Sequence, residues 1–471
     1  MSEIISAPER EPSIWSDIRD SIRGSRRDYT TGSIGRAILV LAIPMVLEML
    51  MQSVFEVVDI YFVGKLGPDA VAAVGLSAST IILVFAIGLG LAMAAAAMVA
   101  RRVGEKDYEA ASRTAAQAIL SCVAVAIPIG LAGWFWAPDI LRLMGASSAV
   151  IEVGTGYTAV LFGSNITILL LFLINSVFRG AGDAAAAMRA LWLANILNIV
   201  LDPIFIFGWG PVPAMGATGA AVATAIGRGI GVAYQLMVLF RGAGNVKVRW
   251  HHFRIDWSLI ARLLRISGPG MLQYLVGTAS WMGLMRIMAE FGSEALAGYT
   301  IAIRVIIFAL LPSWGVANAA ATMVGQNLGA LKPDRAERSV WICVAVDAVF
   351  LTLLGLAIII FNEPIMRAFT SDPEVLRIGA RSLWIMALSY PVWALGMITV
   401  QAFNGAGDTA TPTWINLISY WIVQIPMAWI MAVPLGFGPT GVFITIGFAQ
   451  VVLAIVGTIW FRAGTWKRKV V

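Results

Sequence analysis

The sequence predicts an all-α membrane protein with twelve transmembrane helices, arranged as two six-helix lobes related by a parallel internal repeat. The first observation behind this fold class is composition: 59% of the 471 residues are apolar and 13% are charged, with a mean hydropathy of +0.83. Soluble proteins carry about 25% charged residues, so lipid is the expected solvent for this chain. The second observation is a series of long apolar runs, and the third is that the two halves match.

Each predicted span is an apolar run bounded by Gly, Pro or charged residues. A bilayer core of about 30 Å needs roughly 20 residues per helix. Twelve runs meet this requirement, at residues 37–63, 70–100, 110–136, 150–178, 186–209, 217–240, 262–289, 295–325, 337–361, 376–402, 412–434 and 438–461. Residues 1–36 are charged and polar, which predicts a solvated tail rather than a cleavable signal peptide. Residues 462–471 form a basic C-terminal tail.

Lys and Arg are unevenly distributed between the two predicted sides. With the N-terminus placed in the cytoplasm, 25 of the 33 Lys and Arg residues fall on the cytoplasmic side, as the positive-inside rule requires. We therefore expect both termini to be cytoplasmic and the protein to reside in the inner (plasma) membrane. The net charge of +6 follows from this topology, so no nucleic-acid partner is expected.

The two halves of the chain repeat each other at an offset of 225 residues. GLAMAAAAMVARRVG (90–104) matches GVANAAATMVGQNLG (315–329), and FRGAGDAA (178–185) matches FNGAGDTA (403–410). Each half holds six spans, an even number, so both lobes, at 37–240 and 262–461, enter the membrane from the same side. The basic segment 241–261 is the expected cytoplasmic linker. Parallel repeats are typical of secondary transporters, although duplication can also serve stability alone.

Ionisable residues inside the predicted spans indicate function, because each buried charge costs about 2.5–3.5 kcal/mol on insertion scales. The informative ones are Glu48, Glu56, Asp59, Asp202, Arg228, Arg286, Arg304 and Asp347.

Four oxygen-bearing residues of the first half lie in one layer. Asp59 and Asp202 fall about 9–10 Å beneath the outer boundary of their spans and Thr224 about 14 Å, and Asn198, four residues before Asp202, shares its helix face. Hard oxygen ligands suit a metal cation such as Na⁺, while two neighbouring carboxylates can instead share a proton. In the structural alternative, Asp202 merely precedes the kink at Pro203 and Asp59 caps a helix end.

The second half has lost this set, since Asp59 corresponds to Leu284 and Asp202 to Met427. It carries other ionisable residues instead, at Arg286, Arg304 and Asp347. Arg together with Asp predicts an intramembrane ion pair in preference to a substrate contact. The adjacent His251 and His252 lack the further ligands that a zinc site needs, so no metal centre of that kind, no catalytic cofactor and no enzymatic activity are expected.

These stretches resemble the multidrug and toxic compound extrusion (MATE) family. The segments that carry the resemblance are VVDIYFVGKLG (57–67), FRGAGD (178–183), LNIVLDP (197–203), MGATGAAVAT (215–224) and LPSWGVANAAATMVGQNLGALKPDRAERS (311–339). The resemblance implies a V-shaped pair of lobes and efflux of drug-like, often cationic, small molecules against an inward Na⁺ or H⁺ gradient. We expect a monomer embedded in the lipid bilayer.

The resemblance also assigns roles to residues. Asp59, Asn198, Asp202 and Thr224 match the family's first-lobe cation or proton site, and they would be the metal ligands if the ion is Na⁺. Pro44 resembles the bending proline, or hinge, of the first helix. The residues expected at the substrate cavity are Gln52, Asn175 and Glu56. Some family members carry acids in the seventh and tenth helices, but residues 271–285 and 382–401 contain none, so a second cation site is not expected.

Two alternative functions stay open at this point. One is a flippase or exporter of a lipid-linked or lipid-like substrate, which would need several cationic residues around its cavity. The other is a membrane-embedded enzyme, which no nucleophile or metal-ligand cluster in the sequence supports.

Overall fold

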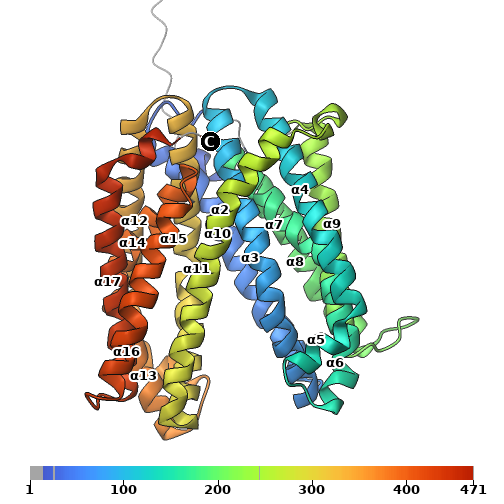
Figure 1. The fold of residues 1–471 in the computed structure, drawn as a ribbon, viewed down its shortest axis with the longest axis vertical. Coiled ribbons are helices and arrows are strands. Elements are labelled where there is room, and N and C mark those ends of the chain that lie inside the picture. Colours follow the sequence, from blue (N-terminus) through green and yellow to red (C-terminus); the bar gives the residue numbers. More distant parts are fainter. Residues whose placement is uncertain (1–13, 25–26, 243, 470) are drawn as a thin grey trace, which may run out of the picture.

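The computed structural model describes residues 14–24, 27–242, 244–469 and 471, so residues 1–13 of the predicted tail lie outside the described part. Two lobes form a V whose arms converge at the end that carries the C-terminus and diverge at the opposite end (Figure 1). The helices of the first lobe are α2 (Ile34–Gly64), α3 (Pro68–Gly104), α4 (Tyr108–Phe135), α5 (Ala137–Leu143), α6 (Ser148–Gly163), α7 (Asn165–Ala181), α8 (Ala184–Phe207) and α9 (Ala217–Arg241).

The second lobe repeats this order. Its helices are α10 (Trp257–Met288), α11 (Ser293–Gly329), α12 (Pro333–Arg367), α13 (Pro373–Ala387), α14 (Tyr390–Gly405), α15 (Ala410–Asn416), α16 (Ile425–Ala432) and α17 (Pro439–Ala463). A π-helical stretch, η3 (Leu417–Gln424), joins α15 to α16. Short 3₁₀ turns are η1 (Trp250–Phe253) in the linker, η2 (Ala289–Phe291) after α10 and η4 (Thr465–Arg468) after α17.

The helices account for the twelve predicted spans. Within the described residues, nine helical segments are long and apolar enough to cross a membrane, and two bent pairs raise the number to eleven. The bent pairs are α6–α7, at 42°, and α13–α14, at 61°, where the sequence predicted single helices over 150–178 and 376–402. The twelfth span is α10, which has 32 residues and carries Arg262, Arg265 and Arg286.

The internal repeat is visible in the backbone. Gly67 and Gly292, which are 225 residues apart, precede the 37-residue helices α3 and α11 with nearly the same positive φ, 98° and 96°. The turns after these helices contain the only two non-glycine residues of the described chain with positive φ, Lys106 and Leu331, again 225 apart. The two lobes therefore share turn geometry as well as helix order.

Glycines allow the two lobes to meet closely at the converging end, which we call the seam. A methyl group at Gly104, the last residue of α3, would overlap the backbone oxygen of Gln326 in α11; at Gly329 it would overlap the backbone oxygen of Arg101. The two contacts are equivalent under the internal repeat, because residues 104 and 101 correspond to residues 329 and 326. Close backbone approach of this kind requires a residue without a side chain.

The N-terminal segment is folded, contrary to the expected solvated tail. Helix α1 (Ile14–Arg23) packs on α2 and α8, and residues 27–32, the N-terminal strap, contact both lobes. Asp28 forms an ion pair of 2.7 Å with Lys106 of the first lobe. On the second lobe, Lys332 donates to the carbonyl of Thr30 at 2.8 Å and Arg335 to the carbonyl of Gly32 at 2.9 Å. Ion pairs and carbonyl contacts therefore fix a segment that composition alone indicated to be free.

The C-terminal residues cross the seam as well. Lys469 forms an ion pair of 3.0 Å with Asp408 of the second lobe, while Arg101 of the first lobe donates to the Lys469 carbonyl. Val471 is buried against Gly407. Both terminal segments therefore hold the lobes together at the converging end.

Candidate functional site

Three of the four predicted ion-binding residues form one hydrogen-bonded unit between α8 and α9. With its amide oriented to satisfy both neighbours, Asn198 donates to Asp202 Oδ2 at 2.9 Å. The Asn198 oxygen accepts from the hydroxyl and from the backbone N–H of Thr224, each at 2.9 Å. Asn198 and Asp202 are buried, with 2% and 0% of their surface exposed. The i, i+4 spacing on α8 thus places both residues on one face, as predicted.

Glycines of α9 bring Thr224 into reach of α8. A methyl group at Gly227 would lie 2.7 Å from the carbonyl oxygen of Ala194, and at Gly231 it would lie 2.9 Å from the Ala194 side chain. Both distances are too short for an ordinary contact between carbon and its neighbours. Because these positions lack side chains, the two helices approach closely enough for Thr224 to bond Asn198 directly.

Asp59 of α2 completes this group, which we call the first-lobe acid site: Asp59, Asn198, Asp202 and Thr224. The carboxyl groups of Asp59 and Asp202 are near enough to interact electrostatically. Asp202 Oδ1 is buried and has no hydrogen-bond partner among the described residues. Two acids from separate helices therefore converge in the membrane region, and one of them presents a free oxygen.

Two residues that the sequence analysis did not assign to the site also belong to it. Arg228 of α9 is 9% exposed and interacts electrostatically with Asp59. Its guanidinium carbon lies 5.7 Å from the centroid of the Phe55 ring, within cation–π range. Tyr157 of α6 interacts with both aspartates. Arg228 could have been found from its spacing, because it lies four residues after Thr224, whereas no local pattern pointed to Tyr157.

Gln52 and Glu56 lie on α2, one turn apart, and are connected to α8. Asn195 donates to Gln52 Oε1 at 3.3 Å, and Gln52 Nε2 donates to Glu56 Oε1 at 3.2 Å. Glu56 is exposed and interacts electrostatically with Tyr274 of α10, which belongs to the other lobe. Gln52 is therefore bonded within the first lobe, while Glu56 also interacts with a residue of the second lobe.

Asn175, the third predicted cavity residue, is fully buried within a polar network of the first lobe. It donates to Glu48 Oε1 at 3.0 Å and accepts from Gln235 Nε2 at 2.6 Å. Glu48, which the sequence left without a role, forms an ion pair of 2.7 Å with Arg179 of α7. The network ties α2 to α7, and in this conformation Asn175 is enclosed by it.

Pro44 lies within α2, which remains one helix from Ile34 to Gly64. Pro44 itself is buried. Just beyond it, a methyl group at Gly315 of α11 would lie 2.7 Å from the backbone nitrogen of Val46. The proline that was predicted to act as a hinge is thus placed beside the seam between the lobes.

The ion pair predicted within the second lobe is wrong. Arg286 and Arg304 are both exposed, and neither forms an ion pair with Asp347 in the part of the chain that is described. Asp347 is fully buried in α12. A hydropathy pattern places residues within spans but does not show which helix faces meet. The two arginines lie on exposed faces of α10 and α11, away from the lobe interior.

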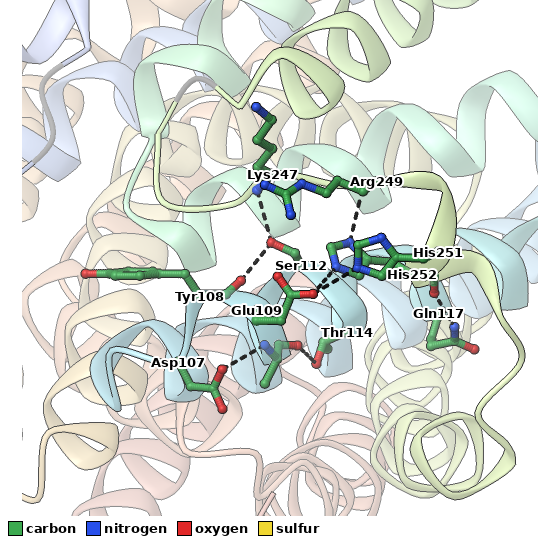
Figure 2. Close-up of polar contacts among 11 residues, drawn as sticks. Asp107, Tyr108, Glu109, Ser112, Thr114, Gln117, Lys247, Arg249, His251 and His252 are labelled. Carbon is green, nitrogen blue, oxygen red and sulfur yellow. Dashed lines mark hydrogen bonds and ion pairs between the residues drawn. The ribbon is translucent and has the colours of Figure 1, made fainter.

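A second polar cluster lies in the linker between the lobes and contains His251 and His252, for which no further metal ligands were expected from the sequence. Figure 2 shows both rings directed at Glu109 of α4. The Nε2 atoms of His251 and His252 lie 3.0 and 2.6 Å from Glu109 Oε1, and the three groups are close enough to share a metal ion.

The hydrogen bonds of His252 favour a different role for this cluster. Its Nδ1 accepts from the backbone N–H of Arg249 at 3.1 Å, so the ring proton is on Nε2, which then donates to Glu109. A metal ligand at Nε2 would have to lose this proton. Gln117 reinforces the arrangement by donating to the carbonyl of His252 at 2.7 Å. The cluster therefore fastens the linker to α4.

Two parallel lobes of membrane-spanning helices, with the half-buried Asp59 and the buried Asp202 brought together in one of them, define a multi-pass membrane transporter. Comparison with known proteins supports this assignment as a membrane transporter. The MatE family model matches residues 44–204 and 269–430, one match in each lobe. This chain belongs to the MATE family of transporters, and it is accordingly not an enzyme.

Individual relatives cover nearly the whole chain. It is 26% identical over 444 residues to a probable multidrug resistance protein, YoeA, of Bacillus subtilis, covering 93% of this chain and 95% of the relative. It is 24% identical over 406 residues to an FAD transporter of Shewanella oneidensis, covering 86% and 89%. A solved MATE transporter in an outward-facing conformation superimposes with a TM-score of 0.87 at 26% identity, covering 93% of this chain and 98% of that one.

Proposed function

We propose that this protein is a secondary antiporter that exports small, drug-like, cationic or amphipathic molecules in exchange for inward Na⁺ or H⁺. The observation that carries the proposal is the convergence of Asp59 and Asp202 at the first-lobe acid site, where Asp202 Oδ1 is left without a protein partner. A buried carboxylate in this position needs a compensating cation. No cofactor is involved beyond the coupling ion.

The charges around the site support exchange of one monovalent cation. The carboxylates of Asp59 and Asp202 and the guanidinium of Arg228 together carry a net charge of −1, which one Na⁺ or one proton neutralises. Glu56, which also interacts electrostatically with Asp59 and Arg228, adds the further negative charge that a substrate cation would meet. Asn198 and Thr224 supply further oxygens if the ion is Na⁺. Coupling requires that the ion bind the two conformations of the transporter with different affinity. A potential of 100 mV adds about 2.3 kcal/mol per charge moved.

We infer that the converging end is cytoplasmic and that the V opens outward. The described basic loops of the positive-inside pattern gather at this end, together with the C-terminal tail. The likeness to an outward-facing transporter supports the same orientation. Location in the inner (plasma) membrane and function as a monomer belong to this proposal.

Glu56 and Gln52 are suited to receive a cationic substrate between the lobes. Glu56 is exposed, lies one turn from Asp59 on α2, and interacts electrostatically with Tyr274 of α10 in the other lobe. A bound substrate cation would be repelled by an ion at Asp59 and attracted when that ion leaves, which gives antiport a simple electrostatic basis. Pro44, beside the seam, is the position at which α2 would bend as the lobes rearrange.

The test uses purified protein in proteoliposomes, with ethidium as the cationic probe and with Na⁺ and pH gradients imposed separately. The double variant Asp59→Asn/Asp202→Asn is expected to lose gradient-driven transport. Asp139→Asn is the matched control, because Asp139 is an exposed acid whose partner is Arg142 on the surface. Unchanged efflux by the double variant would refute the proposal, and translocation of lipid headgroups without ethidium transport would favour a flippase instead.

A further inference from the structure

Asp347 is a buried acid that the first-lobe acid site does not use. It lies 14 residues after the start of α12, about 21 Å along the helix, and none of its surface is exposed. Neither carboxyl oxygen has a hydrogen-bond partner among the described residues. Asp202, in the other lobe, lies about 27 Å along α8, so both acids are deep within the membrane region.

The surroundings of Asp347 contain no countercharge. Its lobe neighbours are α11, α13 and α14, with α2 at one edge. On α11 the nearby polar group is Ser313, which is buried and whose hydroxyl likewise has no hydrogen-bond partner among the described residues. On α12 the titratable neighbour is Cys343, one turn earlier. No Lys, Arg or His of the described residues forms an ion pair with Asp347 from any of these helices.

An ionised carboxylate in this position would be uncompensated, at a cost of several kcal/mol. Hard metal cations such as Ca²⁺ take six or more oxygen ligands. Here one carboxyl group and one hydroxyl are available, so a metal ion would be poorly coordinated. A proton needs only one carboxyl oxygen, and Ser313 can then accept a hydrogen bond from the resulting O–H group.

The acid is specific to the second lobe. At the offset of 225 residues, Asp347 corresponds to Cys122 and Ser313 to Gly88. Cys122 is fully buried in the first lobe. The equivalent place in the first lobe therefore holds a small uncharged residue, which makes cysteine the matched substitution for Asp347.

We propose that Asp347 and Ser313 form a proton-binding site in the second lobe, which carries one proton inward in each transport cycle. The inference rests on the proposed antiport and names H⁺ as a coupling ion. A proton from the outer medium bonds to one oxygen of the ionised carboxyl group, and the same O–H bond breaks when the site opens to the cytoplasm. Pro312, next to Ser313, lacks a backbone N–H and allows α11 to bend at this position.

The first experiment detects the proton without transport. Infrared difference spectra of the purified protein in nanodiscs, recorded in H₂O and D₂O, report the C=O stretch of protonated carboxyl groups. We expect wild type to show a band near neutral pH that Asp347→Asn and Asp347→Cys lose and that Ser313→Ala shifts. Asp347→Cys introduces the residue of the first lobe, so it should fold even if the Asn variant does not. An unchanged band in both Asp347 variants would overturn the proposal.

The second experiment counts protons. The reversal potential of ethidium transport in proteoliposomes gives the number of protons exchanged per substrate. Asp347→Cys is expected to lower this ratio by one while gradient-driven transport persists, and an unchanged ratio would overturn the proposal. Loss of transport in Asp59→Asn/Asp202→Asn tests the antiport itself, so the two failures are distinguishable.

Discussion

The ion pair between Glu48 and Arg179 predicts a marked asymmetry between two substitutions. Only 2% of the Glu48 side chain is exposed, and its Oε1 accepts from Arg179 at 2.7 Å and from Asn175 at 3.0 Å. Oε2 has no partner within the described residues. Arg179 is 14% exposed and also donates to Ser176 at 2.7 Å. Losing the arginine therefore isolates an anion, whereas losing the glutamate leaves a cation with another partner.

The expected magnitudes follow from this geometry. Arg179→Met leaves a buried carboxylate uncompensated and should destabilise the fold by about 3–5 kcal/mol. Glu48→Gln removes one charged hydrogen bond and should cost about 1.5–3 kcal/mol. In the double variant no charge remains, so its cost should fall below the sum of the two by roughly 2 kcal/mol.

Thermal unfolding of the detergent-purified variants provides the assay. With a shift of about 2 °C per kcal/mol for a large chain, Arg179→Met should lower the unfolding midpoint by roughly 6–10 °C. The double variant should unfold at a higher temperature than Arg179→Met alone. If Glu48→Gln proves as damaging as Arg179→Met, or if the two costs add fully, the carboxylate is not the group that needs compensation and the reasoning is wrong.

Three further predictions concern the seam, the first-lobe acid site and the N-terminal strap. Gly104→Leu should abolish transport by keeping the lobes apart, seen as increased thiol labelling of a cysteine placed in the seam; unchanged labelling would contradict it. Arg228→Gln removes a positive charge beside the two acids, so the half-saturating concentration of the coupling ion should fall roughly fivefold, about 1 kcal/mol, and a rise would contradict the electrostatics. In the N-terminal strap, partial burial acts to raise the pKa of Asp28, but the bonds from Lys106 and Thr30 outweigh it and lower this pKa to about 2. The strap's stabilisation is therefore complete above the ordinary pKa of 3.8 and lost only as the pH falls toward 2, so proteolysis of residues 27–32 should be equal at pH 5 and pH 8 in wild type and faster at both in Asp28→Asn.

Local sequence patterns predicted the parts of the site that depend on one helix. Asn198 and Asp202 share a face because four residues make about one turn, and the structure places them in one hydrogen-bonded unit. Arg228 follows Thr224 at the same spacing, but its approach to Asp59 depends on how α9 packs against α2 and α8. Tyr157 comes from α6, and nothing in its neighbourhood in the sequence marks it.

The sequence-based predictions that were wrong all depended on contacts between distant segments of the chain. Hydropathy placed Arg286, Arg304 and Asp347 within spans but could not say which faces of α10, α11 and α12 meet, so the expected ion pair was wrong. The solvated tail was wrong because its contacts with Lys106 and Lys332 join segments 78 and 302 residues apart. The hydrogen bonds of His251 and His252 to Glu109 were likewise not predicted, because Glu109 lies 142 and 143 residues away in the sequence.

The sequence by itself determined that this is a membrane protein, that it is a duplicated six-helix unit, and that one half carries acids at a common depth. Hydropathy, repeat offset and helical periodicity are properties of the chain read in order, so they are available without coordinates. Only the tertiary structure decided which side chains neutralise one another, because that depends on the faces and depths at which distant helices pack. The glycines that allow close helix contacts, at Gly227 and along the seam, are visible in the sequence. Their role is defined only by the backbone atoms that pack against them in the structure.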